Sequence, residues 1–398
     1  MPLSMASPAP AALDRLRFCS SPLGIPLRRT GNCRKQGLSI LRPRRCKPPA
    51  TEETPMTNAE RPLAISAPEP RTLDLIFSDK ARAELHAKYE VIEADPENIA
   101  GLSDEILGRA RYIIGQPPLS AETLARMPAL RSILNVESNL LNNMPYDVLF
   151  QRGIHVVTTG QVFAEPVAEI GLGFALALAR GIVDADVAFR HGNELWGGEG
   201  NASARLIAGS EIGIVGFGDL GKALRRVLSG FRARIRVFDP WLPGSILEEN
   251  GVEPASLEDV LTKSDFIFVV AAVTSENKGF LGAAAFAGMR QGAAFILLSR
   301  ADVVDFDALM AAVASGHIVA ASDVYPEEPL PPGHPVRSLK GFLRSAHRAG
   351  ALDSAFKKMG DMVLEDMDLM DRGLPPMRCK RAERETVSRM RSKPVAVN

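Results

Sequence analysis

Three residues with reactive side chains stand where β-rich runs in the second half of the chain end. Arg300 occurs in LLSRADVVD, Glu328 in SDVYPEEP and His347 in SAHRAG. Histidine suits proton transfer near neutral pH, and a carboxylate beside it can orient the imidazole and favour its charged form. Arginine suits the binding of a carboxylate. This set therefore predicts proton exchange at a carbinol or carbonyl oxygen of an acid that Arg300 holds.

A glycine-rich stretch, GFGDLG at 216–221, has the spacing G-x-G-x-x-G. The spacing alone is weak, but the apolar run IGIV precedes it and a helical pattern follows it. In that context Gly216 allows a tight turn, Gly218 lets the backbone approach a pyrophosphate, and Gly221 allows close helix–strand packing. Asp239, which closes the next apolar run, is expected to bind ribose hydroxyls and repel a 2′-phosphate. The stretch thus predicts a dinucleotide site that favours NAD over NADP.

The elements that must position these residues are short strands alternating with helices. In the first half, strands are predicted at TLDLIF, EVIEA, RYIIG, LRSILNV and HVVTT. Three intervening helical patterns begin at Ser78, Ser103 and Ser120, which are good N-caps. A long apolar helix through PVAEIGLGFALALARGI follows. In the second half the near-continuous apolar runs EIGIV, IRVFD, FIFVVAA, AAFILLS and IVAASDVY are typical of buried parallel strands. The alternation predicts an α/β fold with parallel sheets.

Charge limits the classes of partner. Lys plus Arg and Asp plus Glu both number 47, so no overall charge favours nucleic acid or an anionic membrane. Residues 1–50 are nevertheless rich in Lys, Arg, Ser and Pro, with Asp14 as their acid. Two interpretations stay open: an organellar transit peptide, or a non-native upstream extension with Met56 as the true start.

Cysteine placement indicates a reducing compartment. Cys19, Cys33 and Cys46 lie in the basic extension and Cys379 lies near the end of the chain, so the stretch between them has none. We therefore expect neither a disulfide framework nor a metal site there. The predicted location is the cytoplasm, or an organelle if residues 1–55 are a genuine transit peptide.

Five segments together resemble the D-isomer-specific 2-hydroxyacid dehydrogenases: GIVGFGDLG, VFDP, LLSRADVVDFDAL, SGHIVAASDVYPEEPLPPGHP and SAHRAGA. The resemblance spans roughly 71–375 and is strongest over 205–352. It implies two Rossmann- or flavodoxin-like domains with parallel sheets, an NAD domain inserted into the substrate domain, and a homodimer built on the NAD domain. The activity that it implies is hydride transfer between NAD and a small 2-hydroxy or 2-oxo acid.

Carried over by position, the resemblance implies that Arg300 holds the substrate carboxylate, Glu328 supports the histidine and His347 is the acid/base. The cofactor-binding residues that it implies are Gly216, Gly218, Asp219, Leu220, Gly221, Asp239, Leu298 and Asp323, with Asp323 on the nicotinamide side. No metal is expected. An alternative on the same fold is an NAD(H)-sensing, corepressor-like binding protein, because such proteins keep the same catalytic residues.

The resemblance also predicts how the chain is divided. We expect a disordered basic extension over 1–70, the first part of the substrate domain over 71–162, the NAD-binding Rossmann domain over 163–345, a helix returning to the substrate domain over 346–375, and a loosely held tail over 376–398. Residues 352–398 are not expected to form a second, serine-sensing domain.

One loop departs from the family pattern. The family has a glycine-containing turn after the fourth strand, but this chain has NVESNLLNNM at 135–144. Ser138 and Asn139 are placed to donate to a substrate oxygen, whereas Glu137 would repel a carboxylate unless it is turned away or paired. We therefore expect NAD chemistry on an atypical 2-hydroxy acid.

Overall fold

A computed structural model describes residues 61–137, 139–274 and 276–390 of the protein. Both of its sheets belong to one unit, Met56–Asn398. The predictions for the basic extension up to residue 60, including its three cysteines, and for Ser138 lie outside the described residues.

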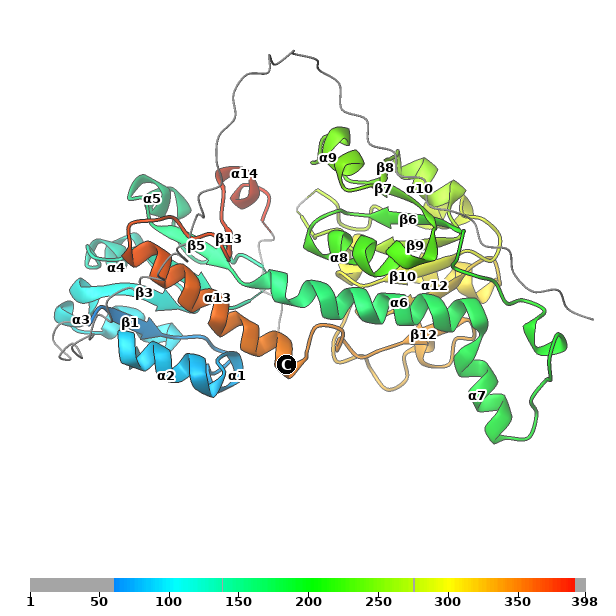
Figure 1. The fold of residues 1–398 in the computed structure, drawn as a ribbon, viewed down its shortest axis with the longest axis horizontal. Helices are drawn as coiled ribbons and strands as arrows, with labels where there is room; N and C mark the ends of the chain where they lie inside the picture. The colour runs from blue at the N-terminus through cyan, green and yellow to red at the C-terminus, as the bar shows by residue number, and fades with distance from the viewer. Residues whose placement is uncertain (1–60, 138, 275, 391–398) are drawn as a thin grey trace, which may run out of the picture. The chain divides into compact units, whose positions relative to one another are not determined.

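The first sheet has the strand order β13-β5-β4-β3-β1-β2 (Figure 1). Its strands are β1 (Leu63–Ser66), β2 (Glu90–Glu93), β3 (Ala110–Ile114), β4 (Ser132–Asn135), β5 (His155–Thr158) and β13 (Lys380–Arg381). All pairings are parallel except β13 with β5. The prediction of disorder over 1–70 is therefore wrong for Leu63–Ser66, whose four residues are all buried. Prolines on both sides of this short run concealed the strand.

The helices of the first lobe are α1 (Leu73–Ile76), α2 (Asp79–Lys88), α3 (Asp104–Arg109), α4 (Ala121–Ala125), α5 (Tyr146–Gln151), α13 (Asp353–Asp371) and α14 (Arg384–Val387), with 3-10 turns at Pro96–Gly101 and Gly160–Phe163. Ser78, Ser103 and Ser120 accept hydrogen bonds from first-turn N–H groups, so the predicted caps are confirmed. The strand predicted at TLDLIF is wrong, because Leu73–Ile76 is a helix. The Thr72 hydroxyl accepts from the N–H of Leu75 and caps this turn, which is too short to show a helical period.

The second sheet is parallel throughout, in the order β12-β11-β10-β9-β6-β7-β8. Its strands are β6 (Glu211–Val215), β7 (Arg234–Phe238), β8 (Glu253–Pro254), β9 (Phe266–Val269), β10 (Ala294–Leu297), β11 (Val319–Ser322) and β12 (Phe342–Arg344). Along β9, Phe266 and Phe268 belong to one buried cluster and Ile267 and Val269 to another, so apolar groups cover both faces. This double burial explains the near-continuous apolar runs in the sequence.

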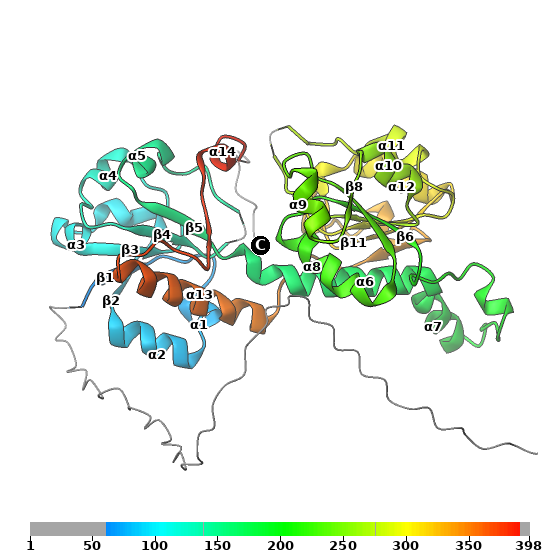
Figure 2. The same ribbon diagram turned by 45° about the horizontal axis from the view of Figure 1, so that its top comes forward.

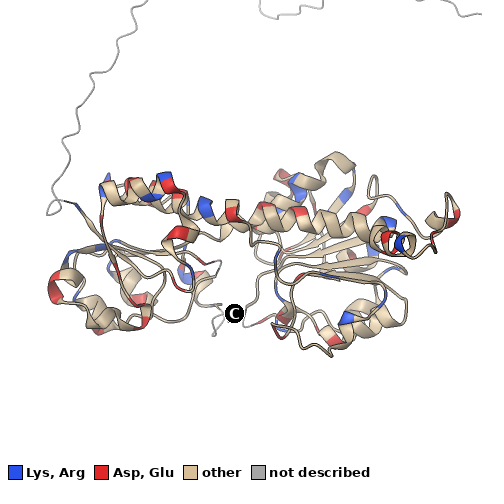
Figure 3. Cartoon of the chain, turned by 90° about the horizontal axis from the view of Figure 1, so that it is seen from below, with Lys and Arg blue, Asp and Glu red and all other residues tan. Residues whose placement is uncertain are grey.

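The helices of the second lobe are α6 (Ala164–Arg180), α7 (Ile182–Arg190), α8 (Asp219–Leu228), α9 (Gly244–Glu249), α10 (Leu257–Lys263), α11 (Ala283–Ala287) and α12 (Phe306–Ala314), with 3-10 turns at Glu199–Asn201, Ser229–Phe231, Ala301–Val303 and Pro335–Arg337. The segment Gly160–Arg180 is long and apolar enough to cross a membrane. Here α6 packs on α8, β10 and β11 (Figure 1), and 39% of its apolar window is buried inside the protein. Figure 3 shows acidic and basic residues interspersed along the helices of both lobes.

The chain leaves the first lobe through α6, builds the second sheet and returns with α13. This helix packs on α1 and α2 and buries Met359, Val363 and Met367. Near its end Asp371 accepts hydrogen bonds from the hydroxyls of Tyr89 and Tyr112, at 2.6 and 2.7 Å. The second lobe is thus inserted into the first, as the family resemblance implied.

The segment after α13 is also part of the first lobe (Figure 2). The buried carboxylate of Asp366 accepts backbone hydrogen bonds from Met377, Arg378 and Cys379, at 2.7–2.8 Å. The strand β13 and the helix α14 follow. The prediction of a loosely held tail over 376–398 is therefore wrong for the stretch up to Val387, because a buried acid anchors it. Asp366 lies in an acid-rich sequence typical of a solvated face, so the sequence did not indicate this anchor.

Candidate active site

The loop after β12 holds His347 in a fixed and costly backbone conformation. His347 has φ 47°, in the left-handed region that favours glycine, which costs other residues about 1–2 kcal/mol. Three hydrogen bonds to Asp323 offset this cost. Its carbonyl accepts from the N–H of His347 at 2.7 Å, and its two carboxylate oxygens accept from Arg348 and Ala349 at 3.0 and 2.9 Å. Asp323 is buried, so it fixes where the imidazole stands.

Glu328 and His347 form a hydrogen-bonded pair. The Glu328 Oε2 atom lies 2.5 Å from Nδ1 of His347, and its Oε1 accepts from the N–H of Tyr325 at 2.8 Å. Burial by itself would raise the pKa of Glu328, but the hydrogen bonds from His347 and Tyr325 and the charges of His347 and Arg300 together lower it. Because a carboxylate only accepts, the proton of the neutral imidazole resides on Nδ1. Nε2 is then the ring nitrogen left for proton exchange.

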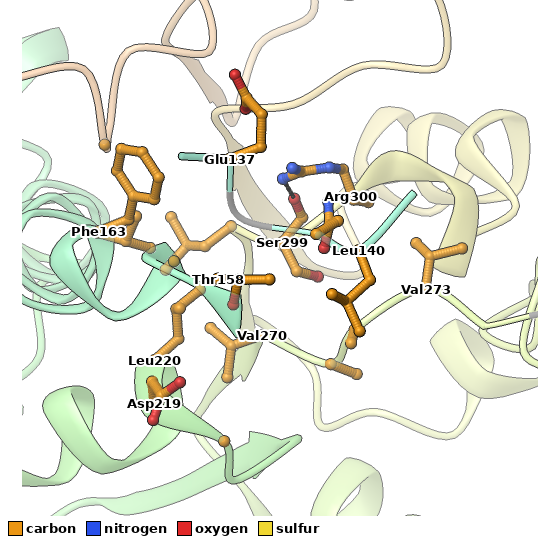
Figure 4. Close-up of a pocket in the computed structure, with 18 of the residues that line it drawn as sticks. Glu137, Leu140, Thr158, Phe163, Asp219, Leu220, Val270, Val273, Ser299 and Arg300 are labelled. Atoms are coloured by element: carbon orange, nitrogen blue, oxygen red, sulfur yellow. Dashed lines mark hydrogen bonds between the residues drawn. The ribbon is translucent and has the colours of Figure 1, made fainter. Parts of the chain in front are cut away.

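Arg300 follows β10 and lines the same pocket as Glu328 and His347. Its Nη1 donates to the carbonyl of Ser299 at 2.7 Å, which holds the guanidinium against its own strand end. Figure 4 shows Arg300 and Ser299 in the same pocket as Asp219 and Leu220 at the start of α8. The structure thus brings together the three residues that the sequence analysis selected.

The glycine-rich loop has the geometry that a dinucleotide phosphate group requires. Gly216 has φ 93°, and a Cβ there would lie 2.6 Å from the Cα of Ala271. A Cβ on Gly221 would lie 2.5 Å from the carbonyl oxygen of Gly216, so helix and loop pack closely. Gly218 is the N-cap of α8 and has open space where a side chain would be. These residues leave a bare helix start that fits a pyrophosphate.

Asp239 ends β7 beside this loop. Its Oδ2 accepts from the N–H of Phe217 at 2.7 Å and its Oδ1 from the N–H of Trp241 at 3.0 Å. Each carboxylate oxygen has a second lone pair, so ribose hydroxyls can still bind. Leu298 and Asp323, the other predicted cofactor residues, line the same pocket. Its volume of about 1880 Å³ exceeds the ~300–1,000 Å³ of usual small-molecule sites and suits a dinucleotide with a substrate.

The glycine-free loop after β4 is held by side-chain amides. Gln116 Nε2 donates to the carbonyl of Leu141 at 2.9 Å and to Asn143 Oδ1 at 3.1 Å. Asn135 Nδ2 donates to the carbonyl of Asn139 at 2.8 Å. Asn139 and Glu137 both line the pocket. Amide side chains therefore hold the shape of this loop.

Sequence reasoning missed Arg71, which pairs with Glu137. Its Nη2 donates to Glu137 Oε2 at 3.0 Å, and both residues line the pocket. Glu137 is therefore paired, one of the two conditions under which we expected it to tolerate a substrate carboxylate. No motif marks Arg71, which stands in a proline-containing loop before α1. Among the described residues, no group of three or more His, Cys, Asp or Glu side chains is arranged to hold a metal.

Comparison with known proteins agrees with this geometry. Residues 172–349 match the family described as "D-isomer specific 2-hydroxyacid dehydrogenase, NAD binding domain". A glyoxylate reductase of Korarchaeum cryptofilum is 32% identical over 264 residues, which cover 65% of this chain and 79% of that protein. A D-3-phosphoglycerate dehydrogenase of Mycobacterium leprae is 30% identical over 63% of this chain and 47% of that protein. The crystal structure of a phosphoglycerate oxidoreductase from Rhizobium etli is 92% identical, with a TM-score of 0.78, over 81% of this chain and 99% of that one.

A dinucleotide loop and a histidine–carboxylate pair lie on one pocket, as in the NAD-binding proteins of this fold. The chain belongs to the D-isomer-specific 2-hydroxyacid dehydrogenase family. It is therefore an NAD-dependent enzyme acting on hydroxy or oxo acids, and this class is confirmed, whereas the roles of Arg300, Glu328 and His347 stay predictions.

Proposed function

We propose that the enzyme interconverts a small 2-oxo acid and its 2-hydroxy acid with Arg300, Glu328 and His347 as its catalytic set. The observation that carries this proposal is the 2.5 Å pair of His347 and Glu328 in the pocket that also holds Arg300 and the dinucleotide loop. NADH, when bound, supplies the hydride that reduces the C2 carbonyl carbon.

Each residue of the set has one task. Arg300 binds the substrate carboxylate through its planar guanidinium. His347 gives the proton on Nε2 to the carbonyl oxygen as the alcohol forms, and takes it back in the oxidative direction. Glu328 keeps the proton on Nδ1 and stabilises the positive charge that the imidazole carries before it donates.

The cofactor is held by the loop and by the ends of the neighbouring strands. We assign the phosphates to the backbone of Gly216, Gly218, Asp219, Leu220 and Gly221. Asp239 takes the adenosine ribose, which disfavours a 2′-phosphate. We assign Leu298 and Asp323, both of which line the pocket, to contacts with the nicotinamide end of the cofactor. In the glycine-free loop after β4, we assign Asn139 and Ser138 to the binding of a substrate oxygen.

The first test is NADH oxidation, followed by absorbance, with glyoxylate, hydroxypyruvate, phosphohydroxypyruvate, pyruvate and bulkier 2-oxo acids. We expect turnover on at least one acid, and its loss in His347→Gln while NADH still binds. Turnover that survives in His347→Gln would refute the assignment of His347, and NADH binding without turnover on any acid would refute the substrate class.

We also propose a homodimer built on the second lobe. Its α7 region exposes large apolar side chains, namely Ile182, Val183, Val187, Phe189, Leu195, Trp196 and Leu206. Trp196 is 74% exposed and packs edge-on against Phe189. A patch of this size favours contact with a second copy. Light scattering of the full chain is expected to give a dimer and of Trp196→Asp a monomer, and a monomeric parent chain would refute this proposal.

For the compartment we propose the cytoplasm. Cys379, in the described part of the chain, is a buried free thiol, as is usual in a reducing environment. Fractionation of cells expressing the full chain tests this, and recovery in an organelle would point to the transit-peptide alternative instead.

A further inference from the structure

An ion pair between Arg71 and Glu137 forms part of the pocket wall. Two nitrogens of Arg71 meet the two carboxylate oxygens, Nε to Oε1 and Nη2 to Oε2, each at 3.0 Å. The N–H at Nε donates to the carbonyl of Val136 at 3.1 Å, so the contact of Nε with Oε1 is ionic and the hydrogen bond to Glu137 comes from Nη2. The side chains are only 14% and 23% exposed, so solvent screens this two-point contact less than a surface pair.

Aromatic rings hold Arg71 independently of Glu137. Its guanidinium carbon lies 4.8 Å from the ring centre of Phe356 and 5.8 Å from that of Phe163. The two rings pack edge to face, 6.1 Å apart, which fixes them relative to each other. Arg71 is therefore expected to keep its place when the charge of Glu137 is removed.

The pair shares its pocket with Arg300 and His347. Figure 4 shows the Glu137 side chain directed away from Arg300. Several arginines line the pocket. Among them, Arg71 has its charge balanced by the Glu137 carboxylate, and Arg300 faces the reacting end of the acid in the proposed function.

We propose that the Arg71–Glu137 pair is a charge filter for the far end of the substrate, and this rests on the proposed function. The filter admits 2-oxo acids whose far end is uncharged and disfavours those with a second anionic group. A second anion must either lie beside the Glu137 carboxylate or displace it, which breaks the charged hydrogen bond from Arg71 Nη2 and the ion pair at Nε.

Two probes of equal carbon number test the filter: 2-oxopentanoate, with a methyl end, and 2-oxoglutarate, with a carboxylate end. We expect the wild type to have the higher kcat/KM with 2-oxopentanoate. Glu137→Gln keeps the shape and an acceptor oxygen but leaves the charge of Arg71 without a counter-charge. The ratio of kcat/KM for 2-oxoglutarate to that for 2-oxopentanoate should therefore rise about tenfold, as expected for a half-buried charge. Glyoxylate, which has no side chain, should change less than about threefold.

Two further variants separate charge from structure. Arg71→Met leaves Glu137 unpaired and should move the preference the opposite way, further toward 2-oxopentanoate, which loss of packing alone does not predict. Asp79→Asn removes a carboxylate on α2 and should leave the preference unchanged. Asp79 is exposed and does not line the pocket.

Several outcomes would overturn the filter. One is a wild type that prefers 2-oxoglutarate or phosphohydroxypyruvate over 2-oxopentanoate. The Rhizobium etli relative is named a phosphoglycerate oxidoreductase, which suggests a phosphorylated acid as the substrate of that protein. Another is Glu137→Gln with an unchanged preference. If no 2-oxo acid is turned over, glyoxylate included, the proposed function has failed. Calorimetric binding of both probes to the NADH complexes of wild type and Glu137→Gln then still tests the filter, and equal affinity ratios would refute it.

Discussion

Replacing Glu328 with glutamine keeps the shape of the side chain but exchanges one acceptor oxygen for an amide group. Glu328 uses both oxygens, one toward Nδ1 of His347 at 2.5 Å and one toward the N–H of Tyr325 at 2.8 Å. Glutamine can serve only one of these donors. If its oxygen faces Tyr325, its amide forces Nδ1 of His347 to accept, and the neutral ring then carries its proton on Nε2.

The size of the effect follows from the bond that is lost. A hydrogen bond to a charged group contributes about 1.5–3 kcal/mol, and each 1.36 kcal/mol is about tenfold in rate. Glu328 and His347 are 28% and 37% exposed, so solvent competes and the lower part of the range applies. We expect kcat of Glu328→Gln to fall about 10- to 30-fold at unchanged NADH affinity.

The assay is the pH profile of kcat for NADH oxidation with the best 2-oxo acid, with NADH binding followed by fluorescence. Glu327→Gln is the matched control, because Glu327 is the exposed neighbour on the same loop. It should keep wild-type kcat. A Glu328→Gln enzyme within twofold of wild type across the profile would refute the role of this carboxylate.

Three further predictions concern the anchor, the response to acid and the cofactor. Asp366→Asn loses at least one of three buried backbone hydrogen bonds, so urea unfolding should show a loss of about 1.5–3 kcal/mol, and a loss below about 0.5 kcal/mol would contradict the anchor. Burial, and then the charge of Arg381, lower the pKa of His155, so the unfolded chain binds this proton more readily and stability should decline as pH falls below about 6.5. In His155→Gln the unfolding free energy should change less with pH between about pH 7 and pH 5.5. An unchanged pH dependence would mean that other groups cause the decline. Asp239→Ser removes the charge that repels a 2′-phosphate, so kcat/KM with NADPH should rise about tenfold, and no gain would refute its role.

The positions of the residues proposed for catalysis could be predicted in part, because ligand sites in α/β folds follow general rules. Parallel strands that are buried on both faces have continuous apolar sequences, and ligands bind beyond their carboxyl ends. Arg300 and Glu328 each follow such a run. His347 follows the short strand β12, which has no such run, and its assignment came from the family resemblance. The dinucleotide loop could also be predicted from its glycines, because close backbone approaches at Gly216 and Gly221 leave no space for a side chain.

The charge filter and the anchored C-terminal segment could not be predicted in this way. Arg71 and Glu137 are 66 positions apart in two short loops, and no periodic pattern links them. Strand β13 has only two residues and depends on a buried acid in another element. Features set by single long-range contacts leave no local signal in the sequence.

The return of the chain through α13 sets the order in which a growing polypeptide can fold. The apolar face made by Ala64, Tyr112 and Ile114 is covered partly by Met359 and Val363, which a ribosome adds only after the whole second lobe. The second lobe can therefore complete its core first. Until α13 is synthesised, the strands of the first lobe keep apolar surface exposed. Such surface is what chaperones bind, so synthesis of this enzyme should depend on them most between the emergence of β5 and that of α13.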